Sequence, residues 1–457
     1  MGLNEIAEKI GGKILQGPGS LSFHKFNIDS RLTEPGELFF AIVARRNGHD
    51  FIPSAVKNGA AGAVISQKIS LADKNFALIQ VANTLKALQE LARKVLAEHS
   101  VKVIGITGST GKTTTKEFIF TLLSQKFKVL KSEGNFNNQL GVPLSLLKLK
   151  DTHEVAVLEM AMSGAGEIKI LTQMAPPDIA VITNISPVHL QFFKSVDEIA
   201  LAKKEILEGI KKDGTAILNG DDERVEKISE DWKGRKILFG FSERCKVRIC
   251  DVPKKGWEGM SFNLRYGQRK ENLSLPVLYD SYLYDFLAAV AVSYALAVPV
   301  ENILDQAGAC KPLSMRGSLL RLRNNIRVVD DSYNSNPKAL EAALKGLADL
   351  PSPRKIAVLG DMLELGKDEV DFHFQAGRQV ALSGWDILVT VGPLSQHMAE
   401  GAHSEGMRKN QIYSFQDSDK AAVQIWTLIQ DNDLVLVKGS RGMTMEKIVE
   451  RLKTKGL

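Results

Sequence analysis

The stretch "GITGSTGKTTTKEF", residues 105–118, decides the fold of the middle of this chain. It follows the apolar run "VKVI" and leads into a helical pattern, so a buried strand, a glycine-rich turn and a helix come in succession. Such a turn lets backbone N–H groups approach phosphate oxygens, and the helix N-terminus adds partial positive charge. Lys112 would reach the outer phosphates of a nucleotide, and the Thr113 hydroxyl would ligate Mg²⁺.

The turn is a shortened variant of the usual phosphate loop, because Ile106 stands where the first glycine is expected. A turn that only caps a helix is the alternative, but strand, glycines, Lys-Thr and helix occur in the order that nucleotide binding requires. The predicted nucleotide contacts are Gly108, Ser109, Thr110, Gly111, Lys112, Thr113 and Thr114.

Composition narrows the class of protein. The chain has 457 residues, and at about 150 residues per domain this length favours roughly three domains. Its 59 Lys and Arg residues are interspersed with 53 acidic ones, which suits small anionic ligands better than a nucleic-acid groove. The 3 cysteines match no metal motif and argue against a disulfide framework. No run of about 18 apolar residues occurs and the N-terminus lacks a signal-peptide core, so we expect a cytoplasmic protein without membrane insertion.

Short β-type runs that end in Gly, Asp, Asn or Ser alternate with helical patterns, which predicts an α/β fold with parallel sheets covered by helices. We expect a small α/β N-terminal domain over 1–98, a central P-loop-type parallel-sheet ATPase domain over 99–312 and a C-terminal Rossmann-like domain over 313–457. Antiparallel strands are expected within 246–278. In such open sheets, ligands bind beyond the carboxyl ends of the strands.

Two further positions are candidates for a metal site, and a pair of adjacent lysines stands out beside them. Mg²⁺ prefers oxygen ligands, and Glu159 at the end of "EVAVLE" is the best carboxylate, although a solvent-facing acid is the alternative. His189 follows the run "VITNISPV", where a histidine more often serves as a structural hydrogen-bonding residue. Lys203 and Lys204 lie in the helical pattern "ALAKKEIL", whose plain interpretation is a solvated helix face.

Taken together, these motifs occur in an order that resembles the Mur ligases, the ATP-dependent amide-forming enzymes of peptidoglycan precursor synthesis. The resemblance spans all three predicted domains. Its motifs are "GSTGKTTTKE", "GNFNNQLGVPLSLL", "LEMAMSGAGEI", "ITNISPVHL", "AKKEI", "DDSYNSNP", "VLGDMLELG" and "VKGSRGMTMEKIV".

The resemblance implies a reaction. The terminal carboxylate of UDP-N-acetylmuramoyl-tripeptide would attack the γ-phosphate of ATP, and the amine of D-alanyl-D-alanine would displace phosphate from the resulting acyl phosphate. ATP and Mg²⁺ are the implied cofactors, a monomer is expected, and the last residue of the tripeptide, lysine or diaminopimelate, stays open.

The resemblance also implies roles for individual residues, with Lys112, Glu159, His189, Lys203 and Arg316 as the catalytic set. Thr113 and Glu159 would hold one Mg²⁺ and His189 a second. Lys203 matches a lysine that sister enzymes carry as a carbamate, an anionic metal ligand, and Lys204 stands beside it as an alternative.

The remaining implied roles concern substrate and nucleotide. Arg316 would reach the ATP phosphates across a domain boundary, and Asp331 would contact the ribose. Asn334 and Asn336 follow in "SYNSNP", part of which suits helix capping instead. The other implied contacts are Asn135, Asn137 and Asn138 in the substrate and nucleotide pocket, and Ser30 and Arg31 of "DSR" for the UDP-sugar, with a surface turn as the alternative for "DSR".

Several positions depart from the family pattern, among them Asn47, Ala161, Ala165 and the segment 281–285. Ser281 and Tyr282 stand where "HN" is usual, and Asp285 replaces the following Asn, so Tyr282 would have to support the adenine by stacking. Two alternatives follow: a related ligase with a different acceptor, including a folylpolyglutamate synthase, or a nucleotide-binding relative that has lost catalysis.

Overall fold

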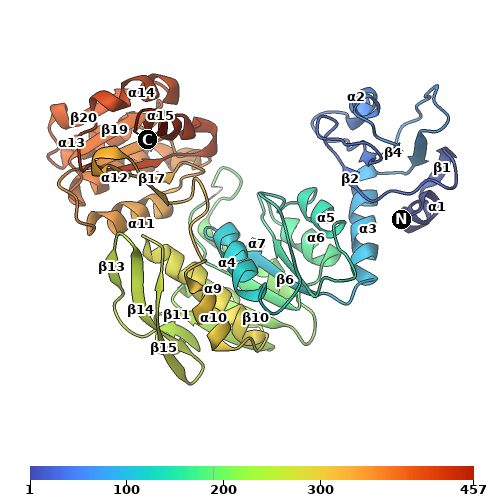
Figure 1. The fold of residues 1–457 in the computed structure, drawn as a ribbon, viewed down its shortest axis with the longest axis horizontal. Helices are drawn as coiled ribbons and strands as arrows, with labels where there is room; N and C mark the ends of the chain where they lie inside the picture. Colours follow the sequence, from blue (N-terminus) through green and yellow to red (C-terminus); the bar gives the residue numbers. More distant parts are fainter. Residues whose placement is uncertain (189, 457) are drawn as a thin grey trace.

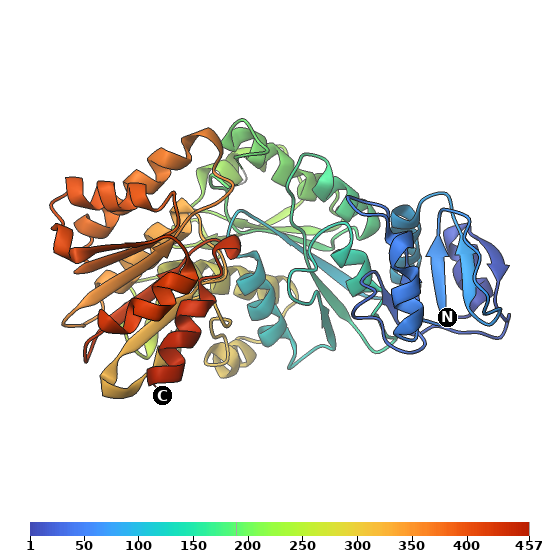
Figure 2. The same cartoon turned by 90° about the horizontal axis from the view of Figure 1, so that it is seen from above.

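The computed structural model describes residues 1–188 and 190–456, which form three sheets arranged along an elongated molecule. Figure 1 shows the N-terminal sheet on the right, the central sheet in the middle and the C-terminal sheet at the upper left. The view from above in Figure 2 shows the same order of the three parts along the molecule, with the two termini at opposite ends. The predicted mixed α/β architecture with a P-loop-type central part is confirmed.

The N-terminal sheet has the strand order β1-β5-β4-β3-β2 and is parallel except at β1. Its strands are β1 (Lys13–Gln16), β2 (Phe26–Asn27), β3 (Leu38–Phe40), β4 (Gly62–Ile65) and β5 (Ala77–Gln80), and its helices α1 (Leu3–Ile10), α2 (Ile52–Lys57) and α3 (Thr84–Ala97). Helix α3 is capped by Asn83, whose side chain accepts the N–H of Lys86. It packs against α1 and also against α5 (Gly141–Leu146) of the central domain. It therefore joins the first sheet to the second.

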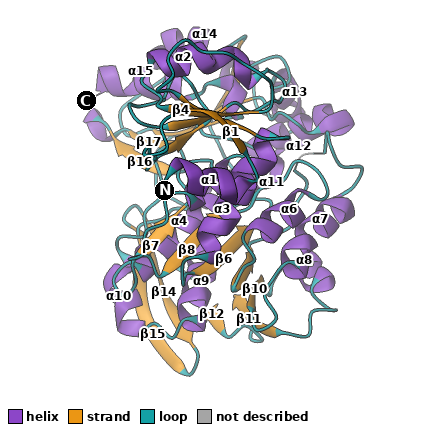
Figure 3. Ribbon diagram, turned by 90° about the vertical axis from the view of Figure 1, so that its right-hand side faces the viewer, coloured by secondary structure: helices purple, strands orange, loops and turns teal. Residues whose placement is uncertain are grey.

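The parallel part of the central sheet has the order β12-β11-β10-β9-β6-β8-β7. These strands are β6 (Lys102–Thr107), β7 (Val129–Lys131), β8 (Val155–Glu159), β9 (Ile179–Ile182), β10 (Thr215–Asn219), β11 (Arg235–Gly240) and β12 (Val247–Ile249). The helices are α4 (Lys112–Leu123), α5 (Gly141–Leu146), α6 (Glu167–Met174), α7 (Val196–Glu208), α8 (Glu223–Ile228), α9 (Asp280–Ala295) and α10 (Val300–Ala307). Figure 3 shows α4, α9 and α10 on one side of these strands and α6, α7 and α8 on the other.

The predicted antiparallel strands extend this sheet at one edge. They are β13 (Lys254–Gly256), β14 (Gly259–Tyr266) and β15 (Arg269–Leu275), and β14 pairs antiparallel with β12, β13 and β15. Alternate residues of β14 are buried, as expected for a strand with one face on the core.

The C-terminal sheet has the order β16-β17-β21-β18-β19-β20 and is parallel except at β16. Its strands are β16 (Ser318–Arg321), β17 (Arg327–Asp331), β18 (Lys355–Gly360), β19 (Ile387–Val391), β20 (Ile412–Phe415) and β21 (Leu434–Lys438). Its helices are α11 (Pro337–Ala348), α12 (Glu369–Leu382), α13 (Gln396–Ser404), α14 (Ser418–Gln424) and α15 (Glu446–Gly456).

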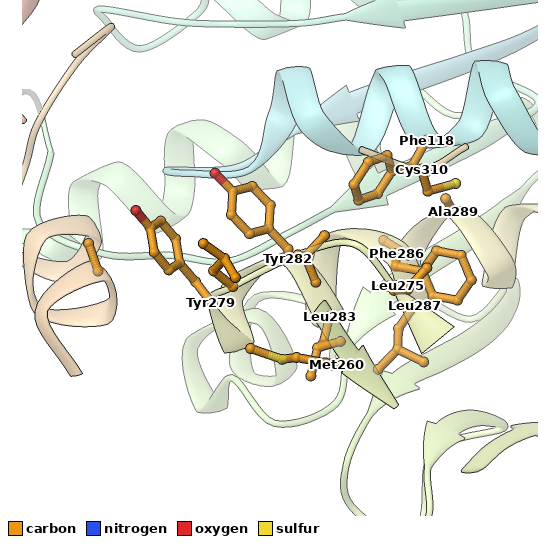
Figure 4. Close-up of a cluster of buried hydrophobic side chains, with 14 of the residues drawn as sticks. Phe118, Met260, Leu275, Tyr279, Tyr282, Leu283, Phe286, Leu287, Ala289 and Cys310 are labelled. Carbon is orange, nitrogen blue, oxygen red and sulfur yellow. The ribbon is translucent and has the colours of Figure 1, made fainter. Parts of the chain in front are cut away.

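A continuous apolar cluster crosses from the central to the C-terminal domain. It includes Phe118 of α4, Phe286 of α9 and Leu340 of α11. Figure 4 shows Tyr279 and Tyr282 side by side in this cluster, with Phe118 and Phe286 further along it. The two tyrosine rings are stacked, with centroids 5.3 Å apart. Burial of apolar surface therefore holds α9 and α11 together.

Two sequence expectations concern cysteines and membranes. Cys245, Cys250 and Cys310 are free thiols, as expected. Within the described parts of the chain, none of the helices is both long and apolar enough to cross a bilayer.

Candidate nucleotide and ligase site

The order of the central strands brings three distant segments to one edge of the sheet. Strand β6 lies between β8 and β9, with Ile106 opposite Glu159 and Thr107 opposite Ile182. Because these strands are parallel, the segments that follow them all emerge at the same edge. The glycine-rich turn, Glu159 and the segment after β9 therefore meet there.

Two glycines of the turn are required by close contacts. A Cβ on Gly108 would lie 1.8 Å from Oγ1 of Thr183, and one on Gly111 would lie 2.0 Å from Oδ1 of Asp285. Both residues also have positive φ, 151° and 82°. Only glycine fits this path of the chain, which ends where α4 begins at Lys112.

The turn is held by the segment after β9. Oγ of Ser109 donates to the carbonyl of Ser186 at 3.0 Å and accepts its N–H at 2.9 Å. Oδ1 of Asn184 accepts both the N–H and the hydroxyl of Thr110, at 3.2 and 3.0 Å. Sequence reasoning missed Asn184, although its position two residues after the strand "IAVI" is a signal that could have found it.

Thr113 and Glu159 are brought into direct contact. The carboxylate of Glu159 is 2% exposed; its Oε2 accepts the Thr113 hydroxyl at 2.9 Å and its Oε1 accepts the Nδ2 amide of Asn137 at 2.9 Å. Two oxygen donors thus lie side by side at the phosphate loop, which is the ligand chemistry that Mg²⁺ prefers. Clusters of three or more His, Cys, Asp or Glu side chains are absent among residues 1–188 and 190–456, but Mg²⁺ takes its other ligands from phosphates and water.

The cations around the turn come from both domains. Nζ of Lys112 donates to the carbonyl of Gly108 at 2.7 Å. Burial lowers the pKa of Lys112; the carboxylate of Glu159 opposes this effect and the guanidinium of Arg316 adds to it. Arg316, which belongs to the predicted C-terminal domain, is therefore near enough to Lys112 to act on its charge.

The three residues Lys203, Lys204 and Glu205 point in different directions from α7. Lys203 is 2% exposed, and burial, reinforced by the charge of Lys112, lowers its pKa well below the ordinary value. Its Nζ has no hydrogen-bond or ion-pair partner within the described residues. Lys204 instead forms an ion pair with Asp231 at 2.9 Å, and Glu205 accepts two backbone N–H groups at the start of α6. Of the two lysines, Lys203 is the one that faces the candidate site.

Other predicted contacts of the central domain have local partners. Asn138 accepts the N–H groups of Leu140 and Gly141 at the start of α5, and Asn135 is exposed. Thr114 is buried in α4. The predicted metal ligand His189 lies outside the described residues.

The altered segment at 281–285 lies beneath the phosphate loop. Tyr282 is buried against Tyr279, and its hydroxyl donates to the carbonyl of Arg316. Asp285 accepts the hydroxyl of Thr115 at 3.2 Å. Burial raises the pKa of Asp285 to about 8, against the opposing effects of Thr115 and Arg316. Contact of Tyr282 with adenine stays a prediction.

The C-terminal motifs converge on Lys438. Its Nζ donates to Asp331 at 2.7 Å and to the carbonyl of Asn334 at 3.0 Å, because β17 and β21 are paired with Asp331 opposite Lys438. Burial raises the pKa of Asp331, and Lys438 opposes this. Sequence reasoning missed Lys438, which belongs to a strand 107 residues away.

Two other predicted site residues of the C-terminal domain, Arg316 and Asn336, make different kinds of contact. The guanidinium of Arg316 lies 4.0 Å from the ring centre of Tyr333. Asn336 caps α11 by accepting the N–H of Ala339 at 2.9 Å, which favours the capping interpretation of this residue.

The predicted UDP-sugar segment lies in the N-terminal domain. The guanidinium of Arg31 is exposed and binds the carboxylate of Asp29 two residues away. Ser30 is buried, and its carbonyl accepts the side-chain amide of Asn58 at 2.7 Å.

Fold and site together define a three-domain α/β protein with a P-loop-type central domain. Comparisons with known proteins specify this class. The model of the Mur ligase middle domain matches residues 106–293, and that of the Mur ligase, glutamate ligase domain matches residues 315–441. The UDP-N-acetylmuramoyl-tripeptide--D-alanyl-D-alanine ligase of Bacillus subtilis (strain 168) is 33% identical over 453 residues, which cover 98% of each chain. This chain therefore belongs to the Mur ligase family.

Solved structures of proteins from the same family also match this chain over nearly its whole length. A crystal structure of MurF from Acinetobacter baumannii superposes with a TM-score of 0.88 at 30% identity, covering 99% of this chain and 98% of that one. The crystal structure of MurF ligase from Thermotoga maritima in complex with ADP superposes with a TM-score of 0.83 at 29% identity. The match covers 94% of this chain and 97% of that one.

Proposed function

We propose that this chain joins D-alanyl-D-alanine to UDP-N-acetylmuramoyl-tripeptide, with cleavage of ATP to ADP and phosphate. Relatives whose names state this activity match the chain over nearly its whole length. The observation that carries the proposal within this chain is the contact of Thr113 with Glu159 at the phosphate loop, beside Lys112.

The chemistry requires anionic groups to approach one another. The tripeptide carboxylate attacks the γ-phosphorus, ADP leaves, and the amine of the dipeptide then attacks the acyl carbon and releases phosphate. Lys112 and Arg316 would lower the repulsion between carboxylate and ATP and stabilise charge on the transferring phosphoryl group. Arg316 and Asp331 belong to the C-terminal domain, so closure of that domain on the loop would complete the site.

The residues at the loop fit Mg²⁺, because a buried carboxylate and a hydroxyl lie in contact there. When bound, Mg²⁺ would neutralise charge on the outer phosphates. Thr113 and Glu159 would hold it, and Asn137 keeps Oε1 of Glu159 oriented. His189 stays a predicted ligand of a second Mg²⁺.

We propose Lys203, not Lys204, as the carbamylated lysine. Attack on CO₂ requires a neutral amine, and burial lowers the pKa of Lys203 in that direction. The new N–C bond would form with loss of a proton, giving an anionic oxygen donor beside Lys112. Lys204 is already paired with Asp231.

Each of the three predicted domains contains one of the three sheets and is assigned its own role. Residues 1–98 would bind the UDP-sugar, 99–312 ATP, and 313–457 would complete the ligase site. The proposed boundary at 98 falls between α3 and β6, and that at 312 falls between α10 and β16. All substrates of the proposed reaction are small molecules, and the enzyme is proposed to be monomeric and cytoplasmic.

Phosphate release by the purified protein with ATP and Mg²⁺ tests the proposal. We expect release to require both UDP-N-acetylmuramoyl-tripeptide and D-alanyl-D-alanine, with an equal amount of UDP-pentapeptide formed. Lysine and diaminopimelate tripeptides should be assayed in parallel, with D-alanine and L-glutamate as alternative acceptors. Release with a different acceptor would favour another ligase of the family. ADP binding without release under any condition would favour the non-catalytic alternative.

A further inference from the structure

Lys116 is a buried charge that the proposed reaction does not use. It lies on α4, one turn after Lys112, and its side chain is fully buried. An isolated ammonium in the interior is costly unless polar groups surround it. Its Nζ donates to the carbonyl of Ser132 at 2.7 Å, lies 3.4 Å from the carbonyl of Gly134, and is 3.3 Å from Oε1 of Glu117. Three acceptors on two elements thus compensate the charge.

The segment that Lys116 holds, residues 132–137, supports Glu159 from two sides. The hydroxyl of Ser132 accepts the backbone N–H of Glu159 at 3.2 Å. At the other end, the amide of Asn137 donates to Oε1 of Glu159 at 2.9 Å. The carbonyl of Asn137 also accepts the N–H of Ala161 at 2.8 Å, which anchors this end beyond β8. Lys116 binds the carbonyl of Ser132 at the first end and that of Gly134 two residues further on.

We propose that Lys116 is a positioning residue of the ATP site, whose ammonium fixes segment 132–137 so that Ser132 and Asn137 orient the Glu159 carboxylate beside Thr113. Lys116 touches neither Glu159 nor Thr113 in any contact above, so it acts through the segment. The inference rests on the proposed role of Glu159 as a Mg²⁺ ligand. Residues that orient a metal ligand typically affect metal affinity or activity by about 10–100-fold when replaced.

The test uses Lys116→Met, which keeps the length and apolar stem but removes the three donors. ADP affinity is measured by calorimetry with Mg²⁺ and with EDTA. We expect the gain in ADP affinity that Mg²⁺ provides to fall by about tenfold, while affinity in EDTA stays unchanged. Hydrogen exchange of the unliganded protein should become faster within 132–137.

Lys131→Met is the matched control. Lys131 pairs with the same Glu117, but it lies on β7 and contacts neither carbonyl of the segment. It should leave both the Mg²⁺ effect and the exchange of 132–137 at wild-type values. Lys116→Gln retains a donor and should recover part of the Mg²⁺ effect; it carries the test if the Met variant does not fold.

An unchanged Mg²⁺ effect in the Lys116 variants, or an equal loss in Lys131→Met, would overturn the inference and leave Lys116 with a purely structural role. Neither readout uses the tripeptide or the dipeptide. If the wild type binds Mg²⁺ and ADP but forms no amide, the proposed function fails while the inference about Lys116 is still decided.

Discussion

The phosphate loop of the central domain and the "DSR" segment of the N-terminal domain are both predicted ligand sites, but the chain builds them differently. Ser109, Thr110 and Thr113 of the loop bind residues that lie 46 to 77 positions further along the chain. In the N-terminal segment, Arg31 binds Asp29 two residues away and is exposed to solvent.

This difference separates a site fixed by the fold from one held locally. Contacts between distant segments form only when the domain folds, so the loop is already arranged for phosphates without a nucleotide. An exposed pair of neighbouring residues costs little to rearrange and adds little to stability. Substitutions of Ser109, Thr110 or Thr113, which make the distant contacts, should therefore disturb folding and activity together more often than substitutions at "DSR". Lys112, whose ammonium bonds only nearby carbonyls of the loop, should affect activity with little effect on folding.

The largest expected effect is a loss of turnover in Lys112→Ala. Removing one preorganised group that stabilises developing charge typically lowers the rate by about 10²–10³-fold. The phosphate-release assay should show at least this loss, and the circular dichroism melting curve should stay close to wild type. Lys128→Ala, at an exposed position of the same domain, is the control. Near-normal turnover of Lys112→Ala would contradict the assignment of the loop.

The same contrast between local and distant contacts limits what could be predicted from the sequence. The strand, turn and helix of the loop are adjacent in sequence, so their order alone predicted them. Lys438 was missed because the strand order of the C-terminal sheet brings it to Asp331, and no local pattern encodes that order. Asn184 follows a predicted strand and could have been found from its position, but its contact with Thr110 depends on the strand order of the central sheet. Lys203 was left open against Lys204, although it lies on the buried stripe Ile199, Ala202, Lys203, Ile206, at helical spacing. Lys116 similarly precedes the buried Ile119 and Leu123.

A pair of glycine substitutions separates backbone strain from contact with a distant residue. Gly111 and Gly166 both precede helices, with φ of 82° and 85° and the same ψ of −12°. A Cβ on Gly111 meets Asp285, whereas one on Gly166 meets no heavy atom within 4 Å. We expect Gly111→Ala to lose about 1–3 kcal/mol more free energy of unfolding than Gly166→Ala, as measured by urea denaturation. Equal losses would mean that α9 does not restrict the loop.

Asp285→Asn tests the same contact through pH. The pKa of Asp285 is raised to about 8, so between pH 4 and this value the folded protein keeps a proton that the unfolded chain releases. Wild-type stability should therefore fall as pH rises through this range. The Asn variant has no proton to lose at this position, so its free energy of unfolding should not fall in this way. The difference in free energy of unfolding, variant minus wild type, should therefore rise by up to about 1.4 kcal/mol per pH unit and level off above pH 8. Urea denaturation at pH 5, 6, 7 and 8 measures the difference. Parallel stability profiles would show that Asp285 is ionised in the fold.

The smallest expected effect on folding is that of Arg31→Ala. Its guanidinium is exposed and its partner is a near neighbour, so the melting curve should match wild type. If Arg31 binds the UDP-sugar, its removal weakens ground state and transition state equally, and KM for the nucleotide-sugar peptide should rise about tenfold while kcat is unchanged. Lys25→Ala, which removes another exposed ion pair of the N-terminal domain, should change neither constant. A fall in kcat with Arg31→Ala would mean that this segment acts in the transition state and that the contrast with the phosphate loop is one of stability alone.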